Sequence, residues 1–289
     1  MTNDVVYYRN ASLSEINMFY REAGDPSHPT ILLLHGFPTS SHMFRGLIPL
    51  LACFLHVVAP DFPGFGYTES PPATDFDYTF DHLSNTVEEL IQHLGISHYF
   101  VYIMDYGAPV GLRLMEAHPD RILGLVVQNG IAHEEGLTSF WDPIRKYWKD
   151  RTPENEKALL TLFTFDTTRY QYVTGAKDVE KISPDNWYLD YYFLQLPGHT
   201  QIQLDLFYDY QTNLKRYPAF QATFRKYQFP TLIVWGKNDF IFGVPGAKAY
   251  LRDLPHAELH LLDGGHFVLE DHLQQIAKYI LRFAKKVTV

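Results

Sequence analysis

Short apolar runs rich in branched and aromatic residues alternate with helical stretches through the first half of this chain, and this alternation limits the possible folds more than any other feature. Several runs are almost continuously apolar, which is typical of strands buried on both faces of a parallel sheet. Strand–helix alternation predicts a mostly parallel sheet with helices covering both faces. The runs that we predict to be strands are residues 15–20, 30–34, 55–59, 99–104, 122–128, 231–235 and 258–262.

One helix between these runs can be recognised from its periodicity. Apolar residues recur at three- and four-residue spacing from Phe80 to Leu94, and Gly95 provides a stop signal. The segment therefore predicts an amphipathic helix.

The alternation stops after Gln128, and residues 131–220 contain no clean strand. They hold three of the four tryptophans and nine of the twenty tyrosines of the chain. We interpret this segment as a helical insertion, called the lid below, and the flanking sequence (1–130 and 221–289) as one core domain. Most lid aromatics are expected only to pack on that core. A few can line an apolar pocket above the sheet edge, where open α/β folds bind ligands.

Composition and charge argue against several other classes of protein. A net charge of −9 and a pI near 5.8 provide no basic surface for nucleic acid. Residues 1–4 lack the basic-then-apolar order of a signal peptide, and no apolar run approaches the ~18 residues that span a bilayer. The single cysteine, Cys53, excludes an internal disulfide. We expect a soluble, cytoplasmic protein without a membrane span; its oligomeric state does not follow from the sequence.

The first motif that can take part in catalysis is Tyr-Ile-Met-Asp-Tyr-Gly at residues 102–107, where an apolar strand ends at Asp105 and a helix begins. A sharp strand-to-helix turn lifts the residue at its apex out of the sheet, close to the free backbone donors of the helix N-terminus. Gly107 supplies the small side chain that such a crowded turn requires. Considered alone, Asp105 is also a good helix N-cap, which is a common role for aspartate.

Three further segments place chemically useful groups directly after strands. Phe37 lies in a His-Gly-Phe-Pro turn at residues 35–38, where a backbone N–H can face a pocket. Asp239 follows the strand at 231–235, and His266 follows two glycines after the strand at 258–262. Each residue alone has an ordinary explanation as a loop histidine or a turn aspartate. Those explanations do not account for the order along the chain: nucleophile, acid and histidine, each just after a strand.

Together these motifs resemble the branch of the α/β-hydrolases that uses an aspartate nucleophile. The resemblance rests on HGFP, DFPGFG, the DYG turn, WGKNDFIF and DGGHF, in this order along nearly the whole chain. It implies an eight-stranded, mostly parallel sheet, helices on both faces and a helical lid inserted after the sixth strand. It also implies Asp105 as nucleophile, His266 as base and Asp239 as the acid that orients the histidine. The backbone amides of Phe37 and Tyr106 would form the oxyanion hole, and neither a cofactor nor a metal is implied.

An aspartate nucleophile suits particular substrates. Attack on an ordinary ester would give a mixed anhydride, whereas attack on an sp³ carbon that carries a halide or a strained epoxide oxygen gives a stable alkyl ester. Water activated by neutral His266 then attacks the carbonyl carbon of Asp105, and the oxyanion hole stabilises the tetrahedral intermediate. We therefore expect a small, largely apolar organic substrate.

The residues beside the motifs favour an epoxide among these substrates. In the branch that the chain resembles, haloalkane dehalogenases typically have an Asn after the His-Gly pair and a Trp after the nucleophile, where this chain has Phe37 and Tyr106. Haloacetate dehalogenases carry an Arg after the nucleophile. Epoxide hydrolases accept an aromatic residue between His-Gly and Pro, and polarise the epoxide oxygen with lid tyrosines.

The same resemblance suggests which residues bind the substrate. Tyr210 is the best match for a lid tyrosine that donates to the epoxide oxygen, and Tyr147 is our prediction for the second. His35 and Trp141 complete the predicted substrate-binding residues.

Two other functions stay open at this point. One is a C–halogen hydrolase that holds the halide with unfamiliar donors, such as the Tyr106 O–H or a lid Trp N–H. The other is a non-catalytic ligand-binding protein, since a fold does not fix a function. The presence of both Asp239 and His266 argues against the second alternative, because a receptor has no need for this pair.

Overall fold

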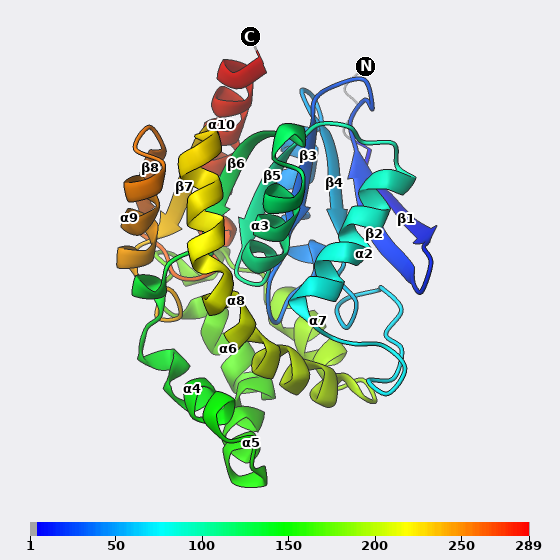
Figure 1. Ribbon diagram of the computed structural model, residues 1–289, viewed down its shortest axis with the longest axis vertical. Coiled ribbons are helices and arrows are strands. Elements are labelled where there is room, and N and C mark those ends of the chain that lie inside the picture. The colour runs from blue at the N-terminus through cyan, green and yellow to red at the C-terminus, as the bar shows by residue number, and fades with distance from the viewer. Residues whose placement is uncertain (1–4, 289) are drawn as a thin grey trace.

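The computed structural model describes residues 5–288 and contains a central eight-stranded sheet (Figure 1). The strand order is β1-β2-β4-β3-β5-β6-β7-β8. β2 pairs antiparallel with β1 and β4, and all other neighbours are parallel. The predicted eight-stranded, mostly parallel sheet is confirmed, while the prediction for residues 1–4 lies outside the described range. The strands are β1 (Tyr7–Ser12), β2 (Asn17–Ala23), β3 (Thr30–Leu34), β4 (His56–Pro60), β5 (Tyr99–Met104), β6 (Ile122–Gln128), β7 (Thr231–Gly236) and β8 (Glu258–Leu262).

Most strands lie where the sequence predicts them. β3, β5, β6 and β8 have the predicted bounds. β4 is shifted by one residue toward the C-terminus, and β7 is one residue longer at its C-terminal end. β2 begins two residues later than predicted and continues to Ala23. β1 is not among the predicted strands, because five of its six residues are exposed and no apolar pattern marks it. Its pairing with β2 at the edge of the sheet makes it a strand.

Helices cover both faces of the sheet, as predicted. α2, α3, α9 and the second half of α8 lie on one face, and α1 and α10 lie on the other (Figure 1). Between residues 5 and 288, no helix is both long and apolar enough to cross a membrane. The α-helices are α1 (Leu47–Leu51), α2 (Phe80–His93), α3 (Gly107–Ala117), α4 (Asp142–Lys149), α5 (Pro153–Leu159), α6 (Phe165–Val173), α7 (Asp185–Leu194), α8 (His199–Tyr227), α9 (Val244–Asp253) and α10 (Val268–Thr288). Short 3-10 helices are η1 (Ser41–Phe44), η2 (Pro119–Arg121), η3 (Glu134–Gly136), η4 (Ser139–Trp141), η5 (Leu160–Phe163) and η6 (Val179–Lys181).

The apolar runs supply two hydrophobic cores, one on each side of the sheet. In β3, Leu32 and Leu34 join the core under α2 and α3, while Ile31 and Leu33 join the core under α1 and α10. Successive side chains of a strand point to opposite faces, so a strand covered on both faces must be apolar at every position. This is why β3 and β5 read as continuous apolar runs.

The predicted amphipathic helix is α2. The Thr79 hydroxyl caps its N-terminus by accepting a hydrogen bond from the His82 backbone N–H at 3.2 Å. The chain leaves the helix through Gly95, whose φ of +66° is a left-handed conformation that glycine adopts without strain. The sequence thus specifies both ends of this helix locally.

The segment between β6 and β7 forms α4 to α8 and contributes no strand to the sheet. α4 to α7 gather at one end of the sheet, and the C-terminal end of α10 lies toward the opposite end (Figure 1). α8 begins among these helices and continues along the face of the sheet as one helix, with Pro218 in its interior. The division into core and lid stays a prediction, and its boundary at residue 220 lies inside α8.

Candidate active site

Asp105 lies at the apex of the turn between β5 and α3. Its φ of 49° is in the left-handed region, which is unusual for a residue with a side chain and strained unless the surroundings hold it. The surroundings leave no room for larger neighbours. A Cβ on Gly107 would lie 2.2 Å from the Leu34 carbonyl oxygen, and a Cβ on Gly36 would lie 2.4 Å from Asp105 Oδ1. The small residue predicted at position 107 is therefore required by a close approach of backbone to backbone.

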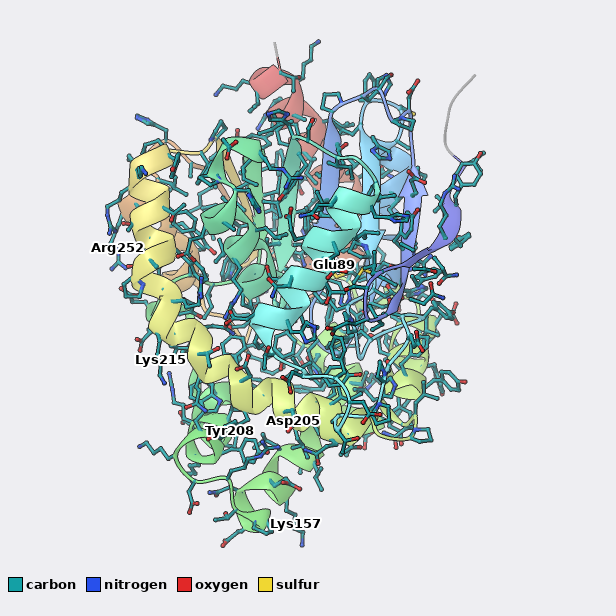
Figure 2. The ribbon with its side chains drawn as sticks, turned by 45° about the vertical axis from the view of Figure 1, so that its right-hand side comes forward. Glu89, Lys157, Asp205, Tyr208, Lys215 and Arg252 are labelled. Atoms are coloured by element: carbon teal, nitrogen blue, oxygen red, sulfur yellow. The ribbon has the colours of Figure 1, made fainter. Side chains whose placement is uncertain are left out.

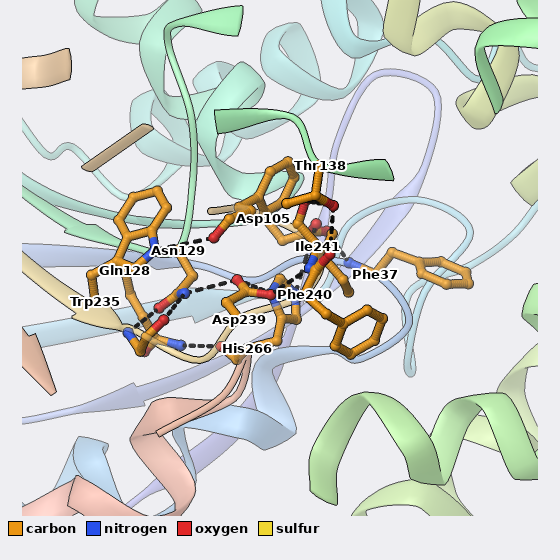
Figure 3. A network of polar contacts seen from close by, with 12 residues as sticks. Phe37, Asp105, Gln128, Asn129, Thr138, Trp235, Asp239, Phe240, Ile241 and His266 are labelled. Carbon is orange, nitrogen blue, oxygen red and sulfur yellow. Dashed lines mark hydrogen bonds and ion pairs between the residues drawn. The ribbon is translucent and has the colours of Figure 1, made fainter. Parts of the chain in front are cut away.

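One oxygen of the buried Asp105 carboxylate faces backbone N–H groups. The Phe37 N–H donates to Oδ1 at 2.7 Å (Figure 3), and a hydrogen bond from the Tyr106 N–H also stabilises the charged form. These are the two amides that the sequence analysis selects. Fixed backbone donors at the Asp105 carboxylate are the arrangement that can stabilise an oxyanion there.

The environment makes Asp105 a more basic carboxylate than usual. Burial raises its pKa from the ordinary value of 3.8 to about 6, against the opposing effects of His266 and of the two backbone N–H groups. A carboxylate held in an apolar site keeps little hydration to lose when it attacks carbon. A strongly perturbed pKa next to a histidine is typical of functional sites.

His266 lies between Asp105 and Asp239 and is fully buried. Its Nδ1 is 2.8 Å from Asp239 Oδ2, and its Nε2 is 3.9 Å from Asp105 Oδ2. A carboxylate can only accept, so Nδ1 carries the proton in the neutral ring and Nε2 keeps a lone pair. Nε2 has no hydrogen-bond partner within residues 5–288. The tautomer is thus fixed so that the basic nitrogen is the one close to Asp105.

The two carboxylates also set the proton affinity of His266. Burial alone would lower the pKa of this imidazole, but the charge and hydrogen bond of Asp239, together with the charge of Asp105, raise it overall. Removing the charge of Asp105 by esterification would therefore bring the pKa of His266 down again. The ring would become a free base at the moment when an ester needs to be hydrolysed.

Asp239 is held by three donors, one of which is a side chain that the sequence analysis does not select. Oδ1 accepts from the Ile241 N–H at 2.7 Å, and Oδ2 accepts from Asn129 Nδ2 at 2.8 Å as well as from His266 (Figure 3). Asn129 also accepts from the Gly236 N–H at 2.9 Å. It follows β6 directly with a φ of 41°, so the Asn-Gly pair after a strand was the available signal.

The two glycines before His266 allow close packing of the backbone and do not adopt an unusual backbone angle. Neither Gly264 nor Gly265 has a positive φ, so no unusual backbone angle requires a glycine at these positions. A Cβ on Gly265 would lie 2.1 Å from the Thr174 carbonyl oxygen, at the start of the chain that leaves α6. The close approach of this segment holds the histidine loop against the lid.

His35 does not contribute a free polar group to the site, which corrects its assignment as a substrate-binding residue. Its Nε2 accepts from the Phe62 N–H at 3.0 Å, and its Nδ1 lies 3.1 Å from the Gly36 carbonyl oxygen. Burial lowers the pKa of His35 to about 3, so the ring is neutral. With both nitrogens bound to backbone, His35 fixes the turn that carries the Phe37 N–H.

Tyr210 of α8 reaches the Asp105 side of the lid. Its ring is 5.8 Å from the ring of Tyr106 and 4.4 Å from that of Trp141. The hydroxyls of Tyr106 and Tyr210 are buried and have no hydrogen-bond partner within the described chain. Burial, followed by the charges of Tyr217 and Asp105, raises the pKa of Tyr210, so its hydroxyl stays protonated and can donate.

Tyr147 of α4 has different ring neighbours from Tyr210, although its buried hydroxyl also lacks a hydrogen-bond partner within residues 5–288, and its role as the second lid tyrosine stays a prediction. It packs against Tyr208 with ring centroids 5.7 Å apart, under the guanidinium of Arg151 at 5.5 Å from its ring. Trp141 does reach Tyr210, but its Nε1–H donates to the Ile241 carbonyl oxygen at 3.2 Å. Trp141 can therefore present only its ring to a substrate.

The remaining walls near Asp105 are apolar. The Phe37 ring contacts those of Phe207 and Phe163 from the lid, with centroids 5.1 and 6.0 Å away. Among residues 5–288, no three His, Cys, Asp or Glu side chains are grouped to hold a metal ion. The site thus combines a buried carboxylate, a histidine base and phenolic donors within an aromatic enclosure.

The eight-stranded sheet and the residues after its strands define the class of protein. The family described as having an alpha/beta hydrolase fold matches residues 29–273. The chain therefore belongs to the α/β-hydrolase family.

Relatives of this chain include more than one kind of hydrolase, so they do not identify its substrate. An uncharacterized hydrolase from Saccharomyces cerevisiae is 45% identical over 97% of this chain and 98% of its own length. A haloalkane dehalogenase from Mesorhizobium japonicum is 29% identical (94% and 89% covered), and epoxide hydrolase 3 from Mus musculus is 25% identical (93% and 74% covered). Among solved structures, a haloalkane dehalogenase from Bradyrhizobium elkani aligns with a TM-score of 0.79 at 22% identity, covering 98% of this chain and 99% of its own, which shows a shared fold.

Proposed function

We propose that this hydrolase opens epoxides to vicinal diols through a covalent ester on Asp105. The proposal rests on one observation: which hydrogen-bond donors near Asp105 are already bound to other groups of residues 5–288 and which are not. The N–H groups of Trp141, Trp148 and Trp235 donate to backbone carbonyl oxygens at 3.2, 2.7 and 3.1 Å. Within the described part of the chain, the phenolic hydroxyls of Tyr106 and Tyr210 have no hydrogen-bond partner. An alkoxide leaving group needs a proton, which a phenol can supply and an indole N–H cannot.

In the first half-reaction, Oδ2 of Asp105 attacks an epoxide carbon while Oδ1 stays on the Phe37 N–H. The bond from that carbon to the ring oxygen breaks, and the alkoxide takes a proton from Tyr210. The products of this step are an alkyl ester, a hydroxyl group and a tyrosinate. The strain of the three-membered ring makes the step feasible with a carboxylate nucleophile.

In the second half-reaction, His266 removes a proton from water, and the resulting hydroxide attacks the ester carbonyl of Asp105. Negative charge develops on the oxygen that faces the Phe37 and Tyr106 N–H groups, where it is stabilised before the diol leaves. Asp239 stabilises the imidazolium formed in this step. The protons that water brings in pass to the second hydroxyl group and back to the tyrosinate, so the enzyme returns to its starting state.

Replacement of Tyr210 by phenylalanine tests the substrate class. Tyr210→Phe should slow the formation of the alkyl-enzyme by roughly 10²–10⁴-fold, the usual cost of a lost general acid. The variant should fold normally, because the hydroxyl that it removes has no hydrogen-bond partner within residues 5–288. Rapid-quench measurement of epoxide consumption in a single turnover provides the rate. Wild-type alkylation by Tyr210→Phe would remove this residue from the mechanism, and a lower melting temperature at full activity would indicate a packing role.

A C–halogen hydrolase is the second candidate, because one relative is named a haloalkane dehalogenase. In that case the free hydroxyls of Tyr106 and Tyr210 would bind the departing halide. Incubation with a panel of aryl and aliphatic epoxides and a panel of haloalkanes separates the two functions. Diol formation supports our proposal, and halide release without diol formation supports the alternative.

The raised pKa of Asp105 predicts how the first half-reaction depends on pH. The attacking group is the carboxylate, which is present above about 6 and is lost as the pH falls through this value. The single-turnover alkylation rate should thus be flat at higher pH and fall roughly tenfold per pH unit below the pKa. Asp105→Ala provides the blank for spontaneous acid opening of the epoxide. A midpoint near the ordinary value of 3.8 would contradict the effect of burial.

A further inference from the structure

α8 carries Tyr210 on its first half and is weakened just after it. Pro218 has no N–H, so the Leu214 carbonyl oxygen loses its normal helical partner, and a proline ring inside a helix favours a bend. Figure 2 shows α8 descending the face of the sheet to Lys215 and then turning toward Tyr208 and Asp205. The position of Tyr210 therefore depends on what fixes the first half of α8 to the core.

Several polar contacts fasten that half to the core, among them Gln203 to the Gly64 carbonyl oxygen at 3.1 Å and Arg216 to Glu116 at 2.7 Å. Two others lie close to Tyr210, one on each side of it. Asp209 Oδ2 accepts from the Phe80 N–H at the start of α2, at 2.8 Å. Asn213 Oδ1 accepts from Arg113 Nη1 at 2.7 Å. Asn213 is fully buried and lies only five residues before Pro218, so its contact holds α8 directly next to the weak point.

Arg113 connects this contact to the helix that carries the nucleophile. It lies on α3, is 5% exposed, and its Nη1 also donates to the Pro109 carbonyl oxygen at 3.0 Å. Its Nε donates to Asp81 Oδ1 of α2 at 2.5 Å. Arg113 thus holds together α2, α3 and α8, and the first turn of α3 follows Asp105 directly. A buried guanidinium that lost its Asn213 partner would favour a different packing of α8.

We propose that Asn213 is a positioning residue for the reaction: bound to Arg113, it fixes the bend of α8 and so holds the Tyr210 hydroxyl at the leaving group above Asp105. This inference rests on the proposed function, in which Tyr210 is the proton donor. Asn213 touches neither the substrate nor the reacting atoms, and acts only through the placement of Tyr210.

A double-mutant cycle tests the inference with styrene oxide as the probe. Asn213→Leu, which keeps the side-chain size and removes the acceptor, should slow single-turnover alkylation by ~10–100-fold, as misplacement by about an ångström does. In a Tyr210→Phe background, the same substitution should slow it by less than about twofold, because there is no hydroxyl left to place. Asn213→Asp should restore most of the rate, since a carboxylate also accepts from Arg113.

Gln221→Leu is the matched control for a general loss of α8 packing. Gln221 lies on α8 beyond Pro218, and its Nε2 donates to the Ala132 carbonyl oxygen at 2.9 Å. This variant should lose stability and keep wild-type alkylation. If Asn213→Leu does not fold, the pair Arg113→Met with Asn213→Leu removes both partners without leaving a buried charge, and the same loss of rate is expected.

Equal loss of rate in the wild-type and Tyr210→Phe backgrounds would overturn the inference, and so would an unchanged rate in folded Asn213→Leu. A failure of the proposed function would give a different result, because the wild-type enzyme itself would then form no diol. Should it release bromide from a primary bromoalkane instead, the same cycle measured on bromide release tests the coupling of Asn213 to Tyr210.

Discussion

A single turnover in heavy-oxygen water, with enzyme in excess, is expected to give a product whose oxygen at the attacked carbon is light. In the proposed two-step route this oxygen comes from the Asp105 carboxylate, and solvent oxygen replaces it there when the ester is hydrolysed. Direct attack of water on the substrate would instead put heavy oxygen into the product. Mass spectrometry of the product and of the peptide that contains Asp105 measures both fates.

Other acidic residues of the chain and a variant that lacks the Asp105 carboxylate provide the controls for this prediction. The Asp105 peptide should gain the label, while Asp239 and the lid acids Asp142, Asp190 and Asp209 should not. Asp105→Ala should reduce turnover by a factor on the order of 10⁴–10⁶, as is typical when one member of a coupled catalytic unit is deleted. Asp105→Asn is a weaker variant, because such an amide can hydrolyse back to aspartate. Heavy oxygen in the first product beside an unlabelled Asp105 would leave this residue only a general-base role.

The second large effect is expected for His266→Gln. This variant should consume one equivalent of substrate and then stall, because alkylation of Asp105 needs no base and hydrolysis of the ester does. Turnover should fall by a factor on the order of 10⁴–10⁶. Intact mass should rise by the full mass of an epoxide substrate. For a haloalkane the gain would be smaller by the mass of the lost hydrogen halide, so the trapped species also reports the substrate class.

Asp239→Asn provides the comparison for this trap. It removes the charge that stabilises the imidazolium, so the hydrolytic half-reaction should slow much more than alkylation. Asn129, the Ile241 N–H and the loop geometry stay in place around residue 239. If folded His266→Gln forms no adduct with any substrate that the wild-type enzyme accepts, the proposed order of steps is wrong.

The features that make Asp105 suitable as a nucleophile are unfavourable for the folded chain. Its backbone has a φ of 49°, close packing around its turn requires glycine at positions 36 and 107, and burial raises the pKa of its carboxyl group to about 6. Strained and desolvated residues persist where the surrounding structure holds them, and they gather at active sites. In the proposed first half-reaction, in which only the carboxylate attacks, the aromatic enclosure that destabilises the charge would also keep water away.

The parts of the fold that the sequence predicts well are those whose signal is local. β3, β5 and β6 are buried on both faces, so nearly every residue in them must be apolar, and their bounds can be read directly. α2 carries its own cap and its own stop signal. β1 has neither, because an exposed edge strand depends on its pairing with β2 rather than on its own residues.

Part of the candidate site could be predicted for a related reason. In a parallel sheet the residues that follow the strands meet at one edge, so the order of Asp105, Asp239 and His266 along the chain already suggested their proximity. Side chains of the lid carry no such constraint. Tyr147 and Tyr210 look alike in the sequence, yet only Tyr210 lies beside Tyr106, because the packing of α4 and α8 decides which face of each helix is turned inward.

The sequence by itself determined seven of the eight strands, the turn that carries Asp105 and the order of the three polar residues, because backbone sterics and apolar periodicity act between near neighbours. The tertiary structure alone decided that His35 holds a loop and that Asn129 supports Asp239. It also decided that the N–H groups of Trp141, Trp148 and Trp235 are occupied, while the hydroxyls of Tyr106 and Tyr210 have no hydrogen-bond partner among residues 5–288. These outcomes depend on hydrogen bonds between segments far apart in the chain, such as Asn129 with Asp239 and Trp148 with Phe207. The sequence shows only which kinds of group a polar side chain can bind, and the tertiary structure determines which of those groups lies next to it.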